Sequence, residues 1–178
     1  MTEQDLIKGC LRDDSQCQEE VFRQYAGKMF AVCLRYARHR MEAEDILQDA
    51  FIRIFDSIAQ FQFKGSFEGW IRRIVVNTAL KKYQKKSFKD ECIGIDEDFN
   101  LSLEPSVYAD LHEEELLNLI AALPEGYRLV FNLYAIEGYS HAEIAMMLGI
   151  DESTSRTQLL KARRTLQEKI VELQKIAV

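Results

Sequence analysis

Apolar side chains recur at spacings of three and four residues along most of this chain, and no stretch alternates apolar and polar residues as a half-buried strand would. Only 2 prolines and 8 glycines interrupt the 178 residues. Because 47% of the residues are hydrophobic, the chain can bury a core. We therefore expect an all-α fold.

The helical spacing and the stop signals predict two helical modules. In the front module, a capping serine, Ser15, with Gln18 three residues on, begins the second helix, whose apolar face includes Phe22. In the third helix, Ile46, Ala50, Ile54 and Phe55 are expected to face inward. The predicted helices are 2–11, 15–38, 42–59 and 67–86 in front, then 111–122, 124–136, 140–148 and 151–174.

The charge distribution separates the two modules. The net charge of −6 argues against a nucleic-acid partner. However, residues 71–89 contain seven basic side chains and no acidic one, whereas residues 90–115 contain ten acidic side chains and no Lys or Arg. We interpret 1–88 as one domain, 89–110 as an acidic linker and 111–178 as a second domain.

Residues 139–166 have the pattern of a helix-turn-helix that reads duplex DNA. Ser140 and Glu143 form a capping box, Ala142, Ile144, Ala145 and Leu148 form an apolar face, and Gly149 supplies the turn. Leu159, Ala162 and Leu166 are expected to pack the second helix down. We expect five side chains of this helix to be exposed toward base edges and phosphates: Ser153, Ser155, Arg156, Gln158 and Lys161. A helical hairpin with solvated Ser and Thr is the plainer alternative.

The front module has a second nucleic-acid pattern. Phe61, Phe63, Phe67 and Trp70 surround a glycine-containing loop, immediately before Arg72, Arg73, Asn77, Lys81 and Lys82. Aromatic side chains beside a positive groove hold unstacked single-stranded bases. Phe61 and Phe67 are also candidates for the core, and the lysines for a solvated face.

The remaining polar groups indicate no catalytic or metal site. Cys10, Cys17, Cys33 and Cys92 lack zinc spacing, so we interpret them as reduced, mostly buried thiols, and we expect no cofactor. The acidic patch Glu44, Asp45, Gln48 and Asp49 is either solvated or a dock for a basic protein. No signal peptide or membrane-spanning run is evident, which predicts a cytoplasmic protein without membrane insertion.

Three motifs in order, AEDILQDAFIRIF, FKGSFEGWIRRIVVNTAL and LPEGYRLVFNLYAIEGYSHAEIAMMLGIDESTSRTQLLKARRTL, resemble the extracytoplasmic-function (ECF) group of sigma-70 RNA polymerase sigma factors. The resemblance covers roughly residues 25–86 and 111–169. It implies a sigma domain 2-like four-helix module, a sigma domain 4-like helix-turn-helix, and a non-enzymatic role in promoter recognition and transcription initiation.

The resemblance also implies partners and site residues. Core RNA polymerase would bind through its β′ clamp and β flap, an anti-sigma factor is an expected partner, and promoter DNA is the ligand. Glu44, Asp45, Gln48 and Asp49 would dock on the clamp. The melted −10 strand would contact Phe63, Lys64, Trp70, Arg73, Asn77 and Lys81. The −35 duplex would contact Ser140, Ser153, Ser155, Arg156, Gln158 and Lys161.

Three rival functions predict different features. A stand-alone helix-turn-helix regulator would have an effector pocket and would dimerise, but it leaves the aromatic-basic loop without a role. A recombinase or nuclease needs a nucleophile or clustered carboxylates beside the basic residues, and 71–89 has no carboxylate. A pure protein adaptor would not need two modules that face DNA.

Overall fold

The structure is a computed structural model that describes residues 2–84 and 113–176. Within these residues every regular element is a helix, which confirms the all-α prediction. The chain divides into two compact units, Met1–Tyr83 and Gln84–Val178, which we call the front unit and the rear unit. The predicted acidic linker and Cys92 lie outside the described residues.

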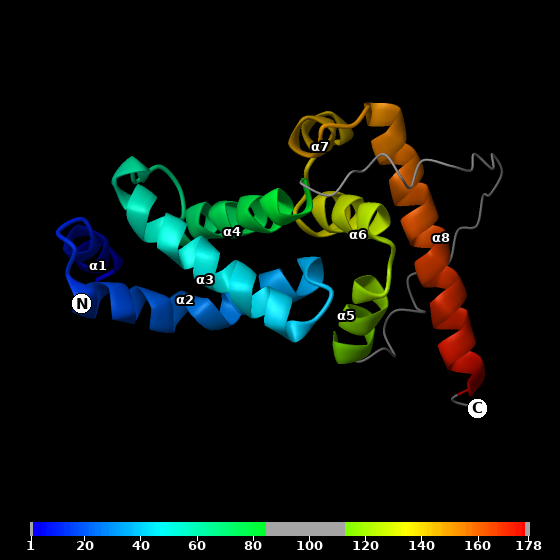
Figure 1. Cartoon of the computed structure of the whole chain (residues 1–178), viewed down its shortest axis with the longest axis horizontal. Helices are drawn as coiled ribbons and strands as arrows, with labels where there is room; N and C mark the ends of the chain where they lie inside the picture. The colour runs from blue at the N-terminus through cyan, green and yellow to red at the C-terminus, as the bar shows by residue number, and fades with distance from the viewer. Residues whose placement is uncertain (1, 85–112, 177–178) are drawn as a thin grey trace. The chain divides into compact units, whose positions relative to one another are not determined.

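The front unit contains α1 (Glu3–Cys10), α2 (Ser15–Tyr36), α3 (Arg40–Ser57), a 3-10 turn η1 (Ile58–Gln60) and α4 (Phe67–Gln84) (Figure 1). Thr2 and Asp5 form a capping box at the start of α1. Phe67, Ile71 and Val75 place one side of α4 in the core. These helices therefore bury one face each and leave the opposite faces to solvent.

The caps of α2 and α3 differ from the prediction. Asp14, not Ser15, caps α2: its carboxylate accepts hydrogen bonds from the backbone N–H groups of Gln16 at 2.9 Å and Cys17 at 3.3 Å. The prediction of Ser15 was wrong because an aspartate one position earlier caps a helix equally well. The third helix also begins earlier than predicted, since Nδ1 of His39 accepts a hydrogen bond from the Glu42 N–H at 3.2 Å.

Two phenylalanines of the front unit are less buried than predicted. The Phe22 side chain is 41% exposed and Phe55 is half-buried, while Ile46, Ala50 and Ile54 are buried as expected. The Phe22 ring packs edge-on against Phe51, with 4.7 Å between ring centroids. Phe51 therefore takes the inward position on α3, and Phe22 covers it from the surface.

The rear unit contains α5 (Glu113–Ala121), α6 (Glu125–Phe131), a π turn η4 (Asn132–Ile136), α7 (His141–Leu148) and α8 (Glu152–Ile176) (Figure 1). Helix α8 packs against α5, α6 and α7. Its core partners are apolar, with Ile120 and Leu123 against Ala162 and Leu166. The predicted helix 124–136 thus divides, because its second half widens into the π turn.

A buried arginine closes the turn between α5 and α6. The Arg128 side chain is 2% exposed, and its Nη1 donates to the carbonyl oxygens of Ala121 at 3.1 Å and Leu123 at 3.4 Å. These carbonyls lie at the C-terminal end of α5 and just after it, where backbone acceptors lack helical partners. The guanidinium satisfies them and also places its charge at the negative end of the helix dipole.

The predicted helix-turn-helix is present as α7 and α8. Ser140 and Glu143 form the expected capping box, and Gly149 ends α7 with φ of 68°. Only a residue that tolerates left-handed backbone continues the chain there without strain. Leu159, Ala162 and Leu166 are buried as predicted, whereas Ala142 is exposed and the prediction that it faces the core was wrong.

Candidate nucleic-acid interface

Three aromatic rings of the front unit form a packed wall. Phe61 and Phe67 are buried, with their ring centroids 5.1 Å apart. The Trp70 ring stacks on Phe67 at 5.8 Å with 13° between planes, and it lies 5.6 Å from Phe61. Phe61 and Phe67 therefore belong to the core, and half-buried Trp70 carries the wall to the surface.

Phe63 stands apart from this wall in both exposure and backbone. Its side chain is 48% exposed, and its φ of 56° lies in the left-handed region that L-residues other than Asn and Asp avoid. Its ring is 5.1 Å from the Phe61 ring. Gly65, two residues later, has φ of 91°. The loop thus holds an exposed aromatic ring against a buried one at the cost of backbone strain.

Polar and basic side chains continue from the aromatic wall along one side of α4. Trp70, Arg73, Asn77 and Lys81 follow at spacings of three and four residues, and the last three are exposed. Ser66 begins the helix by accepting a hydrogen bond from the Gly69 N–H at 3.3 Å. The exposed Lys64 precedes it in the loop. The structure thus brings the predicted −10 residues to one loop and one helix face.

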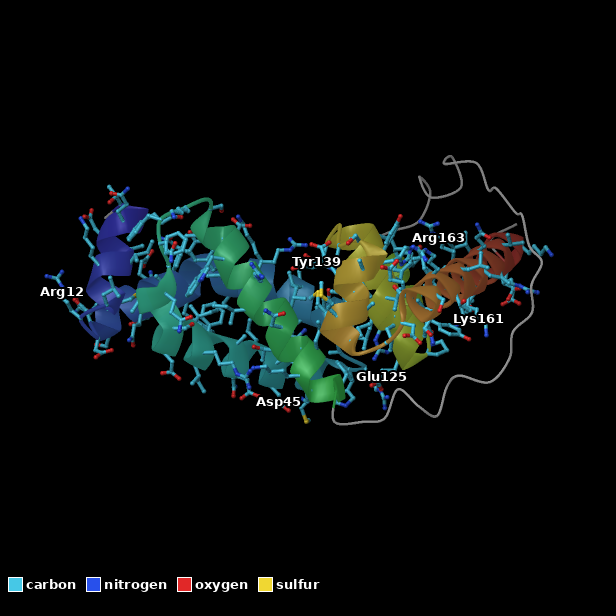
Figure 2. The ribbon with its side chains drawn as sticks, turned by 90° about the horizontal axis from the view of Figure 1, so that it is seen from above. Arg12, Asp45, Glu125, Tyr139, Lys161 and Arg163 are labelled. Atoms are coloured by element: carbon cyan, nitrogen blue, oxygen red, sulfur yellow. The ribbon has the colours of Figure 1, made fainter. Side chains whose placement is uncertain are left out.

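The acidic patch lies on the exposed side of α3, opposite the buried Ala43, Ile46 and Ala50. Two of its carboxylates pair within the unit. Oε1 of Glu44 is 3.0 Å from Nε of Arg40, and Oδ2 of Asp45 is 3.6 Å from Nζ of Lys82 (Asp45 is labelled in Figure 2). Gln48 and Asp49 are also exposed. Exposed ion pairs of this kind are weak, so all four side chains are accessible to a partner.

The rear unit exposes fewer of the predicted −35 residues than the sequence indicates. Ser153 and Arg156 are exposed, and Lys161 is half-buried. Ser155 is 0% exposed and Gln158 is 5% exposed, so the prediction that they face solvent was wrong. Both lie at the edge of the α8 stripe that carries Leu159 and Ala162 into the core. Their polar character outweighed their helical phase in the prediction.

Ser140 is exposed, but its hydroxyl already serves the helix. It accepts a hydrogen bond from the Glu143 N–H at 3.3 Å and donates to the Glu143 carboxylate at 2.8 Å. The Ser140 backbone N–H also donates to the Glu143 carboxylate at 2.8 Å, and this bond, followed by that from the hydroxyl, lowers the pKa of the Glu143 carboxyl. Ser140 therefore starts α7, and only its remaining acceptor capacity is open to DNA.

The exposed side of α8 has members that the sequence did not single out. Thr157, Leu160, Arg163 and Arg164 join Ser153 and Arg156 there, and the Leu160 side chain is 50% exposed. Oε2 of Glu152 is 2.8 Å from Nη2 of Arg156. Lys161 and Arg163 project from different sides of α8 (Figure 2). The helical phase alone, counted from Leu159 and Ala162, could have identified these residues.

His141, which the sequence left without a role, lies at the junction of three elements of the rear unit. Its Nδ1 is 2.9 Å from Oγ of Ser155 on α8. Its ring stacks on Tyr134 of η4, with centroids 4.5 Å apart and 21° between planes. Burial, followed by the charge of Arg156 and later that of Arg163, lowers the pKa of His141, while Glu152 opposes the shift.

The described cysteines are buried thiols. Cys10, Cys17 and Cys33 are buried, as predicted, and carry no disulfide. Burial raises the pKa of Cys10 to about 11 and that of Cys33 to about 12, so neither is a ready nucleophile. Residues 2–84 and 113–176 contain no group of three or more His, Cys, Asp or Glu side chains that could hold a metal ion. None of their helices has the length and hydropathy needed to cross a membrane.

Comparison with known proteins accounts for both units. Residues 21–88 match the family model for sigma-70 region 2, and residues 113–166 match the model for sigma-70, region 4. The chain is 32% identical to the ECF RNA polymerase sigma factor SigE of Mycolicibacterium smegmatis, over 84% of this chain and 60% of that protein. It is 29% identical to the ECF RNA polymerase sigma factor SigW of Bacillus subtilis, over 94% and 96%.

The chain belongs to the ECF group of the sigma-70 family. The front unit of this ECF sigma factor carries region 2, and the rear unit carries region 4. Members of this family are non-enzymatic, DNA-binding regulatory proteins.

Two solved structures share the fold of this ECF sigma factor. The sigma factor RpoE of Bartonella quintana, solved with the anti-sigma factor NepR, has a TM-score of 0.52 and 18% identity, over 86% of this chain and 96% of that one. CnrH, solved with the cytosolic domain of CnrY, has a TM-score of 0.51 and 16% identity, over 96% and 97%. At this identity the likeness concerns the fold alone.

Proposed function

We propose that this ECF sigma factor directs core RNA polymerase to specific promoters and starts transcription there, with region 4 reading the −35 duplex and region 2 holding the melted −10 strand. The observation that carries the proposal is that one chain of this family has both an exposed, strained aromatic ring beside a basic helix face and a capped helix-turn-helix. A stand-alone regulator would need only the second feature.

The −10 strand is held by Phe63, Lys64, Trp70, Arg73, Asn77 and Lys81. An exposed ring offers a stacking face, which is worth about 1–3 kcal/mol per base. The cations and the amide of α4 hold phosphates and base edges. Captured single strand thereby offsets the cost of extruding a base, about a few kcal/mol. The chain itself makes and breaks no bond.

The −35 duplex is read by Ser153 and Arg156 in the N-terminal turns of α8, with Ser140 and Lys161 at the margin. A good bidentate base contact contributes about 1–3 kcal/mol of discrimination. The burial of Ser155 and Gln158 supports an indirect role for them, in packing α8, rather than contact with bases.

The polymerase clamp docks on Glu44, Asp45, Gln48 and Asp49, and the β flap binds region 4. The complex of the Bartonella quintana sigma factor RpoE with the anti-sigma factor NepR supports a partner of that class for this chain as well. Because its partners are polymerase and promoter DNA, the protein works in the cytoplasm.

The test of the function is transcription by core RNA polymerase reconstituted with the purified chain, on duplexes with randomised promoter regions. We expect the transcribed duplexes to share sequences in the −35 and −10 regions. Absence of any shared sequence, with the polymerase shown to be active, would contradict the proposal.

The clamp surface has its own matched pair of variants. Asp49→Lys should weaken binding to core polymerase, whereas Glu19→Lys, an equal charge reversal at an exposed α2 residue, should not. If both variants bind core polymerase equally well, the exposed side of α3 is not part of the interface.

A further inference from the structure

The contact between His141 and Ser155 joins the two helices of the helix-turn-helix at their N-terminal ends. His141 is the first residue of α7, and Ser155 lies in the first turn of α8, where its N–H donates to the Asp151 carbonyl at 3.0 Å. The Ser155 side chain is fully buried, so its hydroxyl serves this contact rather than DNA. A buried hydroxyl bonded across two helices sets how one lies against the other.

A second contact returns from His141 to α8 further along the helix. The His141 ring stacks on Tyr134, and the guanidinium carbon of Arg163 lies 5.8 Å from the centroid of the Tyr134 ring. We call these four residues, Tyr134, His141, Ser155 and Arg163, the His141 clamp. Ser155 and Arg163 are eight residues apart, or about 12 Å along a helix. The clamp therefore contacts α8 at two separated points.

The clamp adds a constraint that the apolar core lacks. Leu159, Ala162 and Leu166 hold α8 down, but apolar contacts tolerate small rotations and shifts of a helix. A hydrogen bond at 2.9 Å does not, because it weakens steeply away from its geometry. Arg156 follows Ser155 directly, so its direction depends on the rotation that the bond holds.

We propose that His141 is a positioning residue for promoter recognition: through Ser155 and Tyr134 it fixes the rotation of α8 and so determines which bases Arg156 and Ser153 reach. The inference rests on the proposed function of region 4. It assigns the choice of −35 sequence partly to a residue that acts behind the helix rather than on the DNA.

The charges around His141 favour the neutral ring that the clamp uses. Arg156 and Arg163 of α8 disfavour its protonation, Glu152 of α8 favours it, and Tyr134 of η4 is uncharged. The ring also lies at the N-terminal turn of α8, whose dipole disfavours a cation. The lowered pKa of His141 agrees with this balance.

The test compares −35 preference among sigma variants in reconstituted holoenzyme. Each variant transcribes duplexes with a randomised −35 region and the −10 region preferred by the wild type, and the transcribed duplexes are sequenced. His141→Ala and Ser155→Ala should each lower the enrichment of the preferred sequence over its single-base variants about tenfold, as expected for one lost base contact. His141→Asn, whose amide can occupy the position of Nδ1, should restore most of it.

Two comparisons separate positioning from mere folding. Because Ser155 acts through its bond to His141, the double variant His141→Ala/Ser155→Ala should lose no more preference than His141→Ala alone. Met146→Ala, at a side chain of α7 that is 78% exposed, is the matched control and should keep the wild-type preference. Thermal unfolding and binding to core polymerase, measured on every variant, identify any that is simply misfolded.

Two results would overturn the inference, and they are distinguishable. If the wild type selects a −35 sequence and the folded variants His141→Ala and Ser155→Ala keep that preference, His141 has no positioning role. If the wild type selects no −35 sequence at all, the proposed function of region 4 fails, and the inference fails with it.

Discussion

At the scale of single residues, Phe63 combines an exposed aromatic ring with a strained backbone that lowers the stability of the loop. Its left-handed φ of 56° is tolerated although about 1–2 kcal/mol separates this conformation from the ordinary one for an L-residue. The rings of Phe61 and Trp70, by contrast, are held in the packed aromatic wall. Strain at an exposed aromatic residue is typical of ligand-binding sites.

The first prediction isolates that strain. Phe63→Gly should be more stable than Phe63→Ala by about 1 kcal/mol, because glycine adopts a positive φ without a penalty. The order is reversed at ordinary positions, where glycine destabilises. Both variants lose the ring and should open promoters equally poorly. Chemical denaturation measures the first effect and permanganate footprinting of the −10 region the second. A less stable glycine variant would contradict the strained conformation.

The second prediction concerns the pH dependence of region 4. Because the pKa of His141 lies below its ordinary 6.5, the unfolded chain takes up a proton before the folded chain does. The stabilisation is therefore complete above pH 6.5 and is lost as pH falls through the folded pKa. The lowered pKa of Glu143 acts separately, below its ordinary 4.5.

Thermal unfolding between pH 7.5 and about 5 measures this effect. The midpoint of the wild type should fall more steeply with acidification than that of His141→Asn, and its −35 preference should weaken over the same interval. Parallel slopes for the two proteins would argue against a neutral His141 in the clamp.

At the scale of elements, α1 and α2 approach each other closely at Gly9, which has no side chain. A Cβ added to Gly9 would overlap Sγ of Cys17 and lie 2.7 Å from its Cβ. Gly9, Cys10 and Cys17 are all buried. The backbone of the short α1 at Gly9 therefore packs directly against the Cys17 side chain of α2.

The third prediction follows from that close approach. Gly9→Ala should destabilise the front unit by about 1–3 kcal/mol, as overpacking does in cores. Gly27→Ala is the matched control: Gly27 lies exposed within α2 with nothing near its missing Cβ, so alanine should stabilise the helix by up to about 1 kcal/mol. Urea denaturation of both variants measures the contrast. Equal effects of the same sign would contradict the packing of α1 on α2.

At the scale of the whole molecule, a net charge of −6 opposes binding to a polyanion. The basic face of α4 is local, and the cation of Arg156 is paired with Glu152. Promoter affinity is therefore expected mainly when polymerase carries the chain to DNA.

The fourth prediction tests this dependence. The purified chain alone should bind promoter duplex no more tightly than about 10⁻⁴–10⁻⁶ M at physiological salt, the ordinary non-specific range. The holoenzyme should bind the same duplex far more tightly. Fluorescence anisotropy of a labelled duplex measures both. Tight, sequence-specific binding by the isolated chain would contradict the dependence on polymerase.

Sequence reasoning worked where one physical signal dominated. The spacing of Leu159, Ala162 and Leu166 and the left-handed turn at Gly149 follow from helical period and backbone sterics, which are local. The prediction was wrong for Ser155, because its polar side chain favours exposure whereas its helical phase places it toward the core. The hydrogen bond to His141, on another helix, is what allows Ser155 to be buried. The placement of His141 itself depends on Tyr134, whose position no local pattern encodes.

The π turn at 132–136 explains why the position of Tyr134 is hard to predict from the sequence. The Glu137 N–H donates to the Asn132 carbonyl at 2.9 Å, five residues back, so this turn holds one residue more than an α-turn. Deleting one residue here would let the chain close as an ordinary α-turn and would shift Tyr134 from its present register with the His141 ring. Loss of a single codon inside this helix is therefore expected to alter promoter preference, although no residue that faces DNA is replaced.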